Sequence, residues 1–227
     1  MTARIMLAAT AALLLAAAPL AAQENLSPWV LEDYEMNSDT RDDEIQERID
    51  QGYLPVGIET TDDDDTLWVL YIHSDSLPFD QFLIAEYGGV QELEDQMGSM
   101  INQGWVPVDI ARYQDGMLAF YINTDVVTIG DWGLTATVGR TEMIEETYRE
   151  GTEAGYSPWG LTADDTGTLW FLFLEEPTRD EPRGVSLSYH AADEDEFELG
   201  VNQKIGQGWI PWGVMFGPEN IYFQYTN

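Results

Sequence analysis

The same order of polar and apolar positions recurs four times along the chain. Each copy contains a polar stretch whose apolar residues lie four positions apart, as Ile45 and Ile49 do in the first copy, and this spacing predicts a helix. Acidic residues crowd the start of these stretches, where they would complement the positive end of a helix dipole. A glycine follows each stretch, at Gly52 in the first copy, and predicts a left-handed residue that ends the helix.

Strand periodicity follows each of these glycines. In the first copy Leu54, Val56 and Ile58 alternate with other residues, which predicts a strand with these three side chains facing inward. A polar turn and a second apolar segment, residues 67–72, then predict a hairpin. The inward positions expected in the other copies are Val106, Val108 and Ile110, then Ser157, Trp159 and Leu161, then Ile210, Trp212 and Val214. The other second strands are expected at 117–122, 169–174 and 221–225, and one further strand precedes each helix, at 29–36, 82–87, 133–138 and 185–190.

A signature of glycine, aromatic residue, any residue and proline marks the junction between helix and strand in every copy. Its members are Gly52, Tyr53 and Pro55, then Gly104, Trp105 and Pro107, then Gly155, Tyr156 and Pro158, then Gly208, Trp209 and Pro211. The spacings of 52, 51 and 53 residues indicate a tandem repeat. The predicted role is structural, because the glycine ends the helix, the aromatic ring packs back on its last turn and the proline prevents continuation.

The sequence therefore predicts an α+β protein of four tandem βαββ repeats of about 50 residues, with mainly antiparallel sheets and one helix per repeat. The expected divisions are a signal peptide at 1–22 and repeats at 23–76, 77–127, 128–180 and 181–227. A single repeat of this length is marginal, so neighbouring copies are expected to complete one another's cores. One ring of sheets and two pseudo-symmetric halves both fit this pattern.

The first residues have the pattern of an export signal. Arg4 is followed by an apolar run from Ile5 to Ala18 and by small residues, which predicts cleavage after Ala22 and a periplasmic or secreted protein. No later segment reaches the length of about 18 apolar residues that a membrane span needs, so no span is predicted.

The chain is strongly acidic, with 42 Asp and Glu, 9 Lys and Arg and a net charge of −33 among 227 residues. Such a surface argues against nucleic acid as a partner, because phosphate contacts need clustered basic residues. A cationic partner and a solvated acidic coat adapted to salt remain alternatives. The 44% hydrophobic content argues against a disordered polyanion.

The helix that ends in Gly-Trp-x-Pro or Gly-Tyr-x-Pro before a hairpin resembles two kinds of small bacterial domain. One is a family of unknown function with the signature Gly-Trp-x-Pro-x-Gly, and the other is the bacterial tandem-repeat domain found beside some serine hydrolases. Gly57, Gly160 and Gly213 match the second glycine of the first signature, whereas Asp109 departs from it. Neither family has a settled activity, so the resemblance implies a fold and leaves the ligand or protein partner unknown.

The residues offer little recognisable catalytic chemistry. The chain has no cysteine, which excludes disulfides, thiol nucleophiles and cysteine-based zinc sites. Lys204 is the only lysine, and Val201 stands where a Ser-x-x-Lys nucleophile would be. His73 and His190 follow strands in different repeats and are expected to be ordinary strand-end histidines, so no catalytic residue and no cofactor are predicted.

One acidic cluster, Asp62, Asp63, Asp64 and Asp65, suggests a calcium site, because calcium prefers several oxygen ligands. The spaced Asp-x-Asp-x-Asp-Gly pattern is absent and the other repeats place turns at this point, so a solvated hairpin turn is the competing interpretation. The favoured function is that of an exported, non-catalytic binding or interaction protein. An inhibitor of an exported enzyme and a carboxylate-dependent hydrolase are the alternatives.

Overall fold

The computed structural model describes residues 27–61, 65–74, 79, 81–164, 166–191, 194–217 and 220–227. These residues contain four helices and twelve strands, and the strands form four antiparallel sheets of three. The order along the chain is β1 (Trp29–Glu35), α1 (Arg41–Asp50), β2 (Tyr53–Thr60), β3 (Thr66–His73), β4 (Gln81–Tyr87), α2 (Val90–Asn102), β5 (Trp105–Tyr113), β6 (Gly116–Asn123), β7 (Trp132–Val138), α3 (Thr141–Glu153), β8 (Ser157–Ala163), β9 (Thr168–Leu174), β10 (Val185–Ala191), α4 (Glu194–Gly206), β11 (Ile210–Phe216) and β12 (Asn220–Thr226). Each group of strand, helix, strand and strand is called repeat 1 to 4 in chain order.

Every sheet has the same strand order. The predicted hairpins are confirmed, since β2 pairs with β3 and the other repeats do the same. The strand that precedes the helix pairs with the far side of the second hairpin strand, which gives the orders β1-β3-β2, β4-β6-β5, β7-β9-β8 and β10-β12-β11. The helix therefore connects the two edge strands of its sheet, and the hairpin's second strand lies in the middle.

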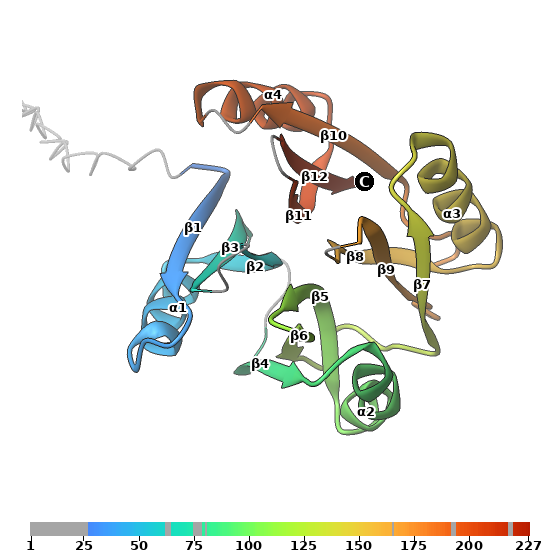
Figure 1. The fold of residues 1–227 in the computed structure, drawn as a ribbon, viewed down its shortest axis with the longest axis horizontal. Helices are drawn as coiled ribbons and strands as arrows, with labels where there is room; N and C mark the ends of the chain where they lie inside the picture. The colour runs from blue at the N-terminus through green and yellow to red at the C-terminus, as the bar shows by residue number, and fades with distance from the viewer. Residues whose placement is uncertain are drawn as a thin grey trace, which may run out of the picture.

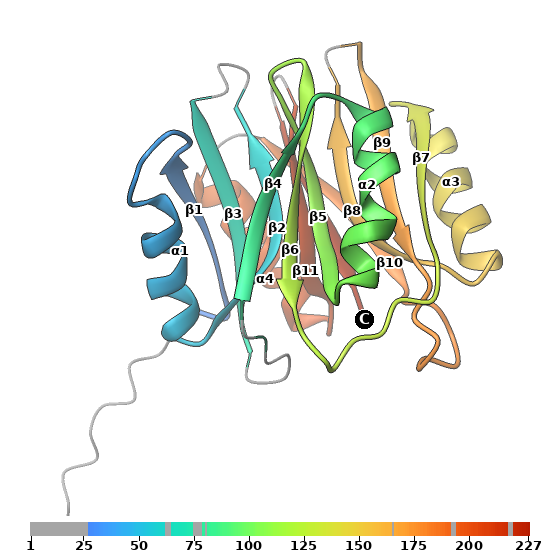
Figure 2. The ribbon, with the colours of Figure 1, turned by 90° about the horizontal axis from the view of Figure 1, so that it is seen from below.

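The four sheets are arranged around a common centre, with the helices on the periphery (Figure 1). The innermost strands are β2, β5, β8 and β11, and each contacts its two neighbours, including β11 with β2. Seen from the side, the strands run along the axis of this ring (Figure 2). The structure thus closes into one ring, so the alternative of two separate halves is wrong for the described residues.

All four signature glycines end a helix in the left-handed conformation that the sequence indicated. Their φ angles lie between 89° and 97°, and the N–H of each bonds to a carbonyl three residues earlier, as Gly52 does to Ile49 at 2.9 Å. Because a Cβ atom is strained at such angles, glycine is the favoured residue for this reversal of the chain.

The inner strands do not alternate regularly, and this corrects the predicted inward sets. In each sheet the register shifts by one residue after the signature proline, for example between Pro55 and Gly57 in β2. The bulge and the ring explain why every residue of β2 is buried on both faces. Ile210, expected to face inward at the start of β11, is 43% exposed. Trp159 and Trp212 are buried as expected.

Acidic side chains cover the outer faces of the helices, where residues such as Asp43, Glu47, Asp95 and Glu146 are exposed. Like charges on one compact body repel, and salt screens them over about 10 Å at 0.1 M. We therefore expect the melting temperature to rise between dilute buffer and molar sodium chloride. A calorimetric melt that does not move would show that repulsion between these charges is negligible.

Candidate functional site

Asp109 occupies the centre of the ring. The equivalent residue in the other repeats is a glycine, namely Gly57, Gly160 and Gly213. A Cβ atom on Gly57 would lie 3.0 Å from the Cα of Gly213, and one on Gly160 would lie 2.5 Å from Oδ1 of Asp109. The glycines allow the inner strands to approach closely, and one side chain fills the remaining space.

The Asp109 carboxylate joins three repeats by accepting main-chain hydrogen bonds. Oδ2 accepts from the N–H of Ile58 at 2.9 Å, and Oδ1 accepts from the N–H groups of Ile110 at 2.8 Å and Leu161 at 3.2 Å. Burial raises the pKa of Asp109 well above its ordinary value, and these three N–H groups offset part of that effect. The departure of this position from glycine therefore has a structural explanation.

Glu59 is the second buried acid, two residues beyond the central glycine of β2. Its Oε1 accepts from the N–H of Thr60 at 2.9 Å, and its Oε2 accepts from the hydroxyl of Thr162 at 3.3 Å. Burial raises the pKa of Glu59 well above its ordinary value, an effect opposed by these bonds and by the charge of Arg112. Glu59 thus links repeat 1 to repeat 3.

The raised pKa values of Asp109 and Glu59 predict that the protein becomes less stable as the pH rises. Above pH 4 such a carboxyl keeps its proton in the folded protein, whereas the same group in the unfolded chain has lost its proton. The free energy of unfolding therefore falls as the pH rises toward the pKa of the folded state. Urea denaturation from pH 4 to pH 8 should show a slope for the native protein more negative than that of Glu59→Gln, by up to about 1.4 kcal/mol per pH unit. Equal slopes would contradict the raised pKa.

An arginine clamp covers two tryptophans of the inner strands. The Arg183 guanidinium carbon lies 4.8 Å from the ring centroid of Trp159 and 4.7 Å from that of Trp212. Its Nε and Nη2 donate to the two carboxylate oxygens of Glu176 at 2.7 and 2.9 Å. Burial would raise the pKa of Glu176, but the hydrogen bonds and charge of Arg183 bring it below its ordinary value. The clamp lies in the segment between β9 and β10 and fixes that segment to the ring.

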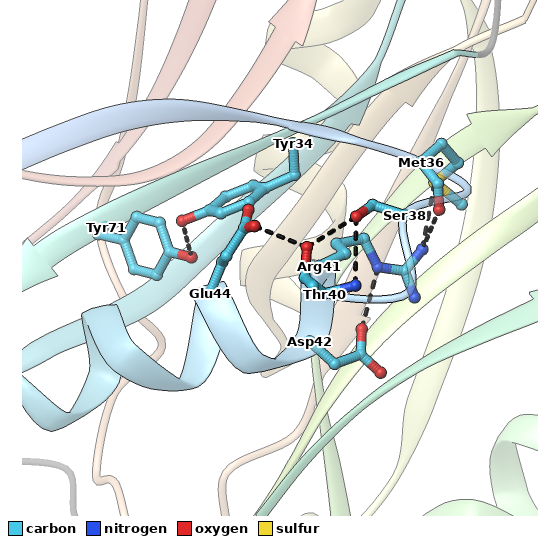
Figure 3. A network of polar contacts seen from close by, with 8 residues as sticks. All are labelled: Tyr34, Met36, Ser38, Thr40, Arg41, Asp42, Glu44 and Tyr71. Carbon is cyan, nitrogen blue, oxygen red and sulfur yellow. Dashed lines mark hydrogen bonds and ion pairs between the residues drawn. The ribbon is translucent and has the colours of Figure 1, made fainter.

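The polar residues at the start of α1 are largely bonded to one another (Figure 3). Arg41 donates to the carbonyl of Met36 at 2.8 Å and to Asp42 at 3.0 Å. The Tyr34 and Tyr71 hydroxyls are 2.9 Å apart beneath the helix, and burial raises the pKa of both. The bond from Arg41 to Met36 fixes the start of the helix to the segment after β1, and the tyrosine pair joins β1 to β3, so both contacts have a structural role.

Repeat 4 replaces this tyrosine pair with a different group. Ser188 Oγ lies 2.8 Å from His190 Nε2 and donates to the hydroxyl of Tyr225 at 3.0 Å. The imidazole packs against the backbone of α4 at Gly200, and its burial lowers the pKa of His190. Tyr225 stands where Tyr71 stands in repeat 1, so Ser188 and His190 supply the partner that another tyrosine supplies there.

The other residues singled out in the sequence lie apart from this group. His73 is exposed at the end of β3, edge-on to Tyr53 with the ring centroids 5.5 Å apart. Asp62, Asp63 and Asp64 lie outside the described residues. Asp65 is exposed, and its carbonyl accepts the Met36 N–H at 2.8 Å. The described part of the chain contains no group of three or more His, Cys, Asp or Glu residues placed to hold a metal ion.

A cavity of about 260 Å³ lies between α3 and β7 in repeat 3. Trp132, Tyr156 and Phe173 supply aromatic walls. Its other lining residues are small or polar, namely Gly133, Thr135, Thr147, Glu150, Gly151 and Ala154. An added Cβ at Gly151 would lie 2.4 Å from the ring of Phe173, so the ring rests directly on the helix backbone.

A second cavity of about 250 Å³ lies at the hairpin ends of repeats 2 and 3. Its lining includes Arg112, Asp115, Asp164 and Trp170. The Asp164 carboxylate already accepts hydrogen bonds from the turn that follows it and from Trp170 Nε1 at 3.3 Å. Asp164 is therefore already engaged in holding its turn, and we take the α3–β7 cavity as the candidate site.

No protein-family model matches the chain, and no curated protein matches its sequence. Within the described segments, each helix is too short or too polar to cross a bilayer.

The α3–β7 cavity was not predicted from the sequence. Its signal is the absence of a side chain at Gly151 and Gly133, and only a comparison of equivalent helix and strand positions between repeats exposes it. The contact of Arg183 with Glu176 was not predicted either, because both residues lie in the segment between β9 and β10, outside the repeated pattern of helix and strands.

Proposed function

We propose that the protein is an exported, non-catalytic binding protein that holds a small ligand in the α3–β7 cavity. The observation that carries this proposal is the set of three aromatic walls with polar groups at their edge. Ligand sites in proteins are typically concave, mostly apolar and provided with a few polar groups that fix orientation. Four tandem βαββ units would supply a rigid frame for this site.

The distribution of acids supports a binding role over hydrolysis. Asp109 and Glu59 have raised pKa values, as a general acid requires, but main-chain and hydroxyl groups of neighbouring repeats surround both carboxylates. Neither residue lines either of the cavities described above. The hydrogen bonds of Asp109 and Glu59 give both residues a structural role.

Export is proposed from the amino-terminal pattern of a basic residue, an apolar run and a small-residue exit before residue 23. The acidic composition suits a protein that meets saline surroundings after export.

Filling the cavity tests the proposal. Gly133 lies on β7, and an added Cβ there meets no atom within 4 Å, so Gly133→Leu should occupy the cavity without disturbing the sheet. We expect saturation-transfer NMR with a library of anionic, neutral and cationic fragments to give ligands for the native protein that Gly133→Leu no longer binds. Affinity for these ligands should fall by at least about tenfold.

Ala136→Leu is the matched control, because Ala136 is exposed on the same strand and does not line the cavity. Both variants should melt within a few degrees of the native protein. A library in which every ligand binds Gly133→Leu as well as the native protein would contradict the proposed site.

A further inference from the structure

One position of the helix that faces the sheet carries a different residue in each repeat. The fourth residue before the signature glycine is Arg48 in α1, Met100 in α2, Gly151 in α3 and Lys204 in α4. Repeats 1 and 4 therefore carry a cation near the carboxyl end of the helix, where the helix dipole favours positive charge. Repeat 3 carries no side chain there.

In repeat 1 this cation lies against the signature aromatic residue. The guanidinium carbon of Arg48 is 5.3 Å from the ring centroid of Tyr53, a typical cation–π distance. Arg48 also pairs with Glu32 on β1, with Nε 2.8 Å from the carboxylate. The space between helix and outer strand thus holds a cation between an aromatic ring and an oxygen ligand.

Repeat 4 has the same arrangement with different residues. Nζ of Lys204 is 5.7 Å from the ring centroid of Trp209, the signature aromatic residue, and 5.6 Å from that of Tyr225. It donates to Oγ of Ser186 on β10 at 2.7 Å. Two repeats therefore place a cation of the chain itself in this space.

Repeat 3 keeps the aromatic walls of this arrangement and lacks the cation. Tyr156 is its signature aromatic residue, and Phe173 stands where Tyr225 stands in repeat 4. The strand positions of Ser186 and Glu32 are Gly133 and Thr135, according to their pairing with β9. All four repeat 3 residues line the cavity.

Two carboxylates lie at or beside the cavity of repeat 3. Glu150 lines it, and the hydroxyl of Tyr156 donates a hydrogen bond of 2.7 Å to Oδ2 of Asp131, a bond that raises the pKa of Tyr156. A phenol that donates to a carboxylate has a more electron-rich ring, which attracts cations more strongly. The neighbouring Arg149 is shared among three glutamates, at 3.6 Å from Glu146, 3.9 Å from Glu150 and 3.1 Å from Glu153.

We infer that the α3–β7 cavity binds a small organic cation, of the alkylammonium or quaternary ammonium class, in the space that Arg48 and Lys204 fill in repeats 1 and 4. This inference rests on the proposed function and names the ligand class of the same site. The volume of about 260 Å³ suits one ammonium-bearing group. The net charge of −33 favours cations over anions at the protein surface.

The test compares two probes of nearly equal shape, choline and its neutral isostere 3,3-dimethylbutan-1-ol, by protein-observed NMR titration at fixed ionic strength. We expect choline to give saturable shifts at residues of α3 and β7, and the neutral isostere to bind about tenfold more weakly. Butyrate serves as the anionic probe and should give no shift.

Two variants separate the cavity from the acidic surface. Gly133→Leu should abolish the saturable choline shifts, while Ala136→Leu should retain them. Tyr156→Leu removes one ring face and keeps an apolar side chain, so choline should bind about tenfold more weakly while the neutral isostere binds as before.

Each other outcome overturns the inference in a recognisable way. Equal affinity for choline and its isostere would show an apolar site without preference for charge. Choline shifts that persist in Gly133→Leu would show diffuse binding to the acidic surface. Fragments of another class that need the open cavity would overturn the cation and leave the proposed function standing, whereas no cavity ligand of any class would overturn both.

Discussion

Replacement of Arg183 by alanine is expected to lower the free energy of unfolding by about 3–5 kcal/mol, because it leaves a buried carboxylate without its partner. The Glu176 side chain is only 6% exposed and that of Arg183 14% exposed. The substitution also removes the cation from the faces of Trp159 and Trp212. Urea denaturation followed by far-ultraviolet circular dichroism should show a lower midpoint with little change of slope.

The pH dependence distinguishes the loss of the ion pair from a general loss of packing. In the native protein the lowered pKa of Glu176 contributes stability that is present above pH 4 and is lost as the pH falls through the folded value. In Arg183→Ala the two strongest interactions that lower the pKa of Glu176 are lost while burial still raises that pKa, so the difference in stability between the two proteins should be larger at pH 7 than at pH 4.

Two further variants serve as controls. Arg179→Ala removes an exposed cation from the same segment and should cost less than about 1 kcal/mol. Arg183→Lys keeps the charge but loses the two-pronged contact with Glu176, so its stability should lie between those of the native protein and Arg183→Ala. An alanine variant as stable as Arg179→Ala would show that the clamp contributes little.

Gly160→Ala is expected to destabilise the protein by about 2–3 kcal/mol, because the centre of the ring has no space for a second side chain. The added Cβ would lie 2.5 Å from Oδ1 of Asp109 and 3.2 Å from its Cα, so a neighbouring strand must move. Gly213→Ala is the matched control at the equivalent position of repeat 4. Its nearest neighbour is 3.4 Å away, and loss of chain entropy in the unfolded state should leave it neutral or slightly stabilising.

A double-mutant cycle assigns the cost to the carboxylate. Asp109→Gly alone should destabilise the protein, because it leaves three buried N–H groups without an acceptor. Adding Gly160→Ala to that variant should cost less than it does in the native protein, since its closest contact is gone. Additive losses in thermal and urea unfolding would contradict the proposed crowding around Asp109.

The local architecture was predictable from the sequence, because it depends on residues close together in the chain. The signature glycines set the helix ends, and the apolar segments placed the second hairpin strands and the strands before the helices within one residue of their observed bounds. The arrangement of the sheets depends on contacts between residues about 50 and 150 positions apart, and no local pattern specifies these contacts.

The difference between local patterns and contacts between distant residues also explains which parts of the candidate site could be predicted from the sequence. Asp109 stood out in the sequence as the one departure from glycine among equivalent positions, but its role required knowledge that four strands meet there. The calcium interpretation came from the run Asp62 to Asp65, of which only Asp65 lies among the described residues, so it stays a prediction. At the α3–β7 cavity, Gly133 leaves open space, whereas at Gly151 the ring of Phe173 takes the place of a side chain. Neither consequence can be predicted until the surface that faces each glycine is known.

The contact between β11 and β2 has a consequence for synthesis. The ribosome synthesises β2 long before β11. Until β11 has been made, β2 can pack against β5 but lacks its other neighbour in the ring. A nascent chain that stops short of Ile210 leaves an apolar strand exposed, and such a strand is a target for chaperones and proteases. The complete ring therefore forms only once β11 has been synthesised, and a product that lacks β11 is exposed to removal before it can accumulate.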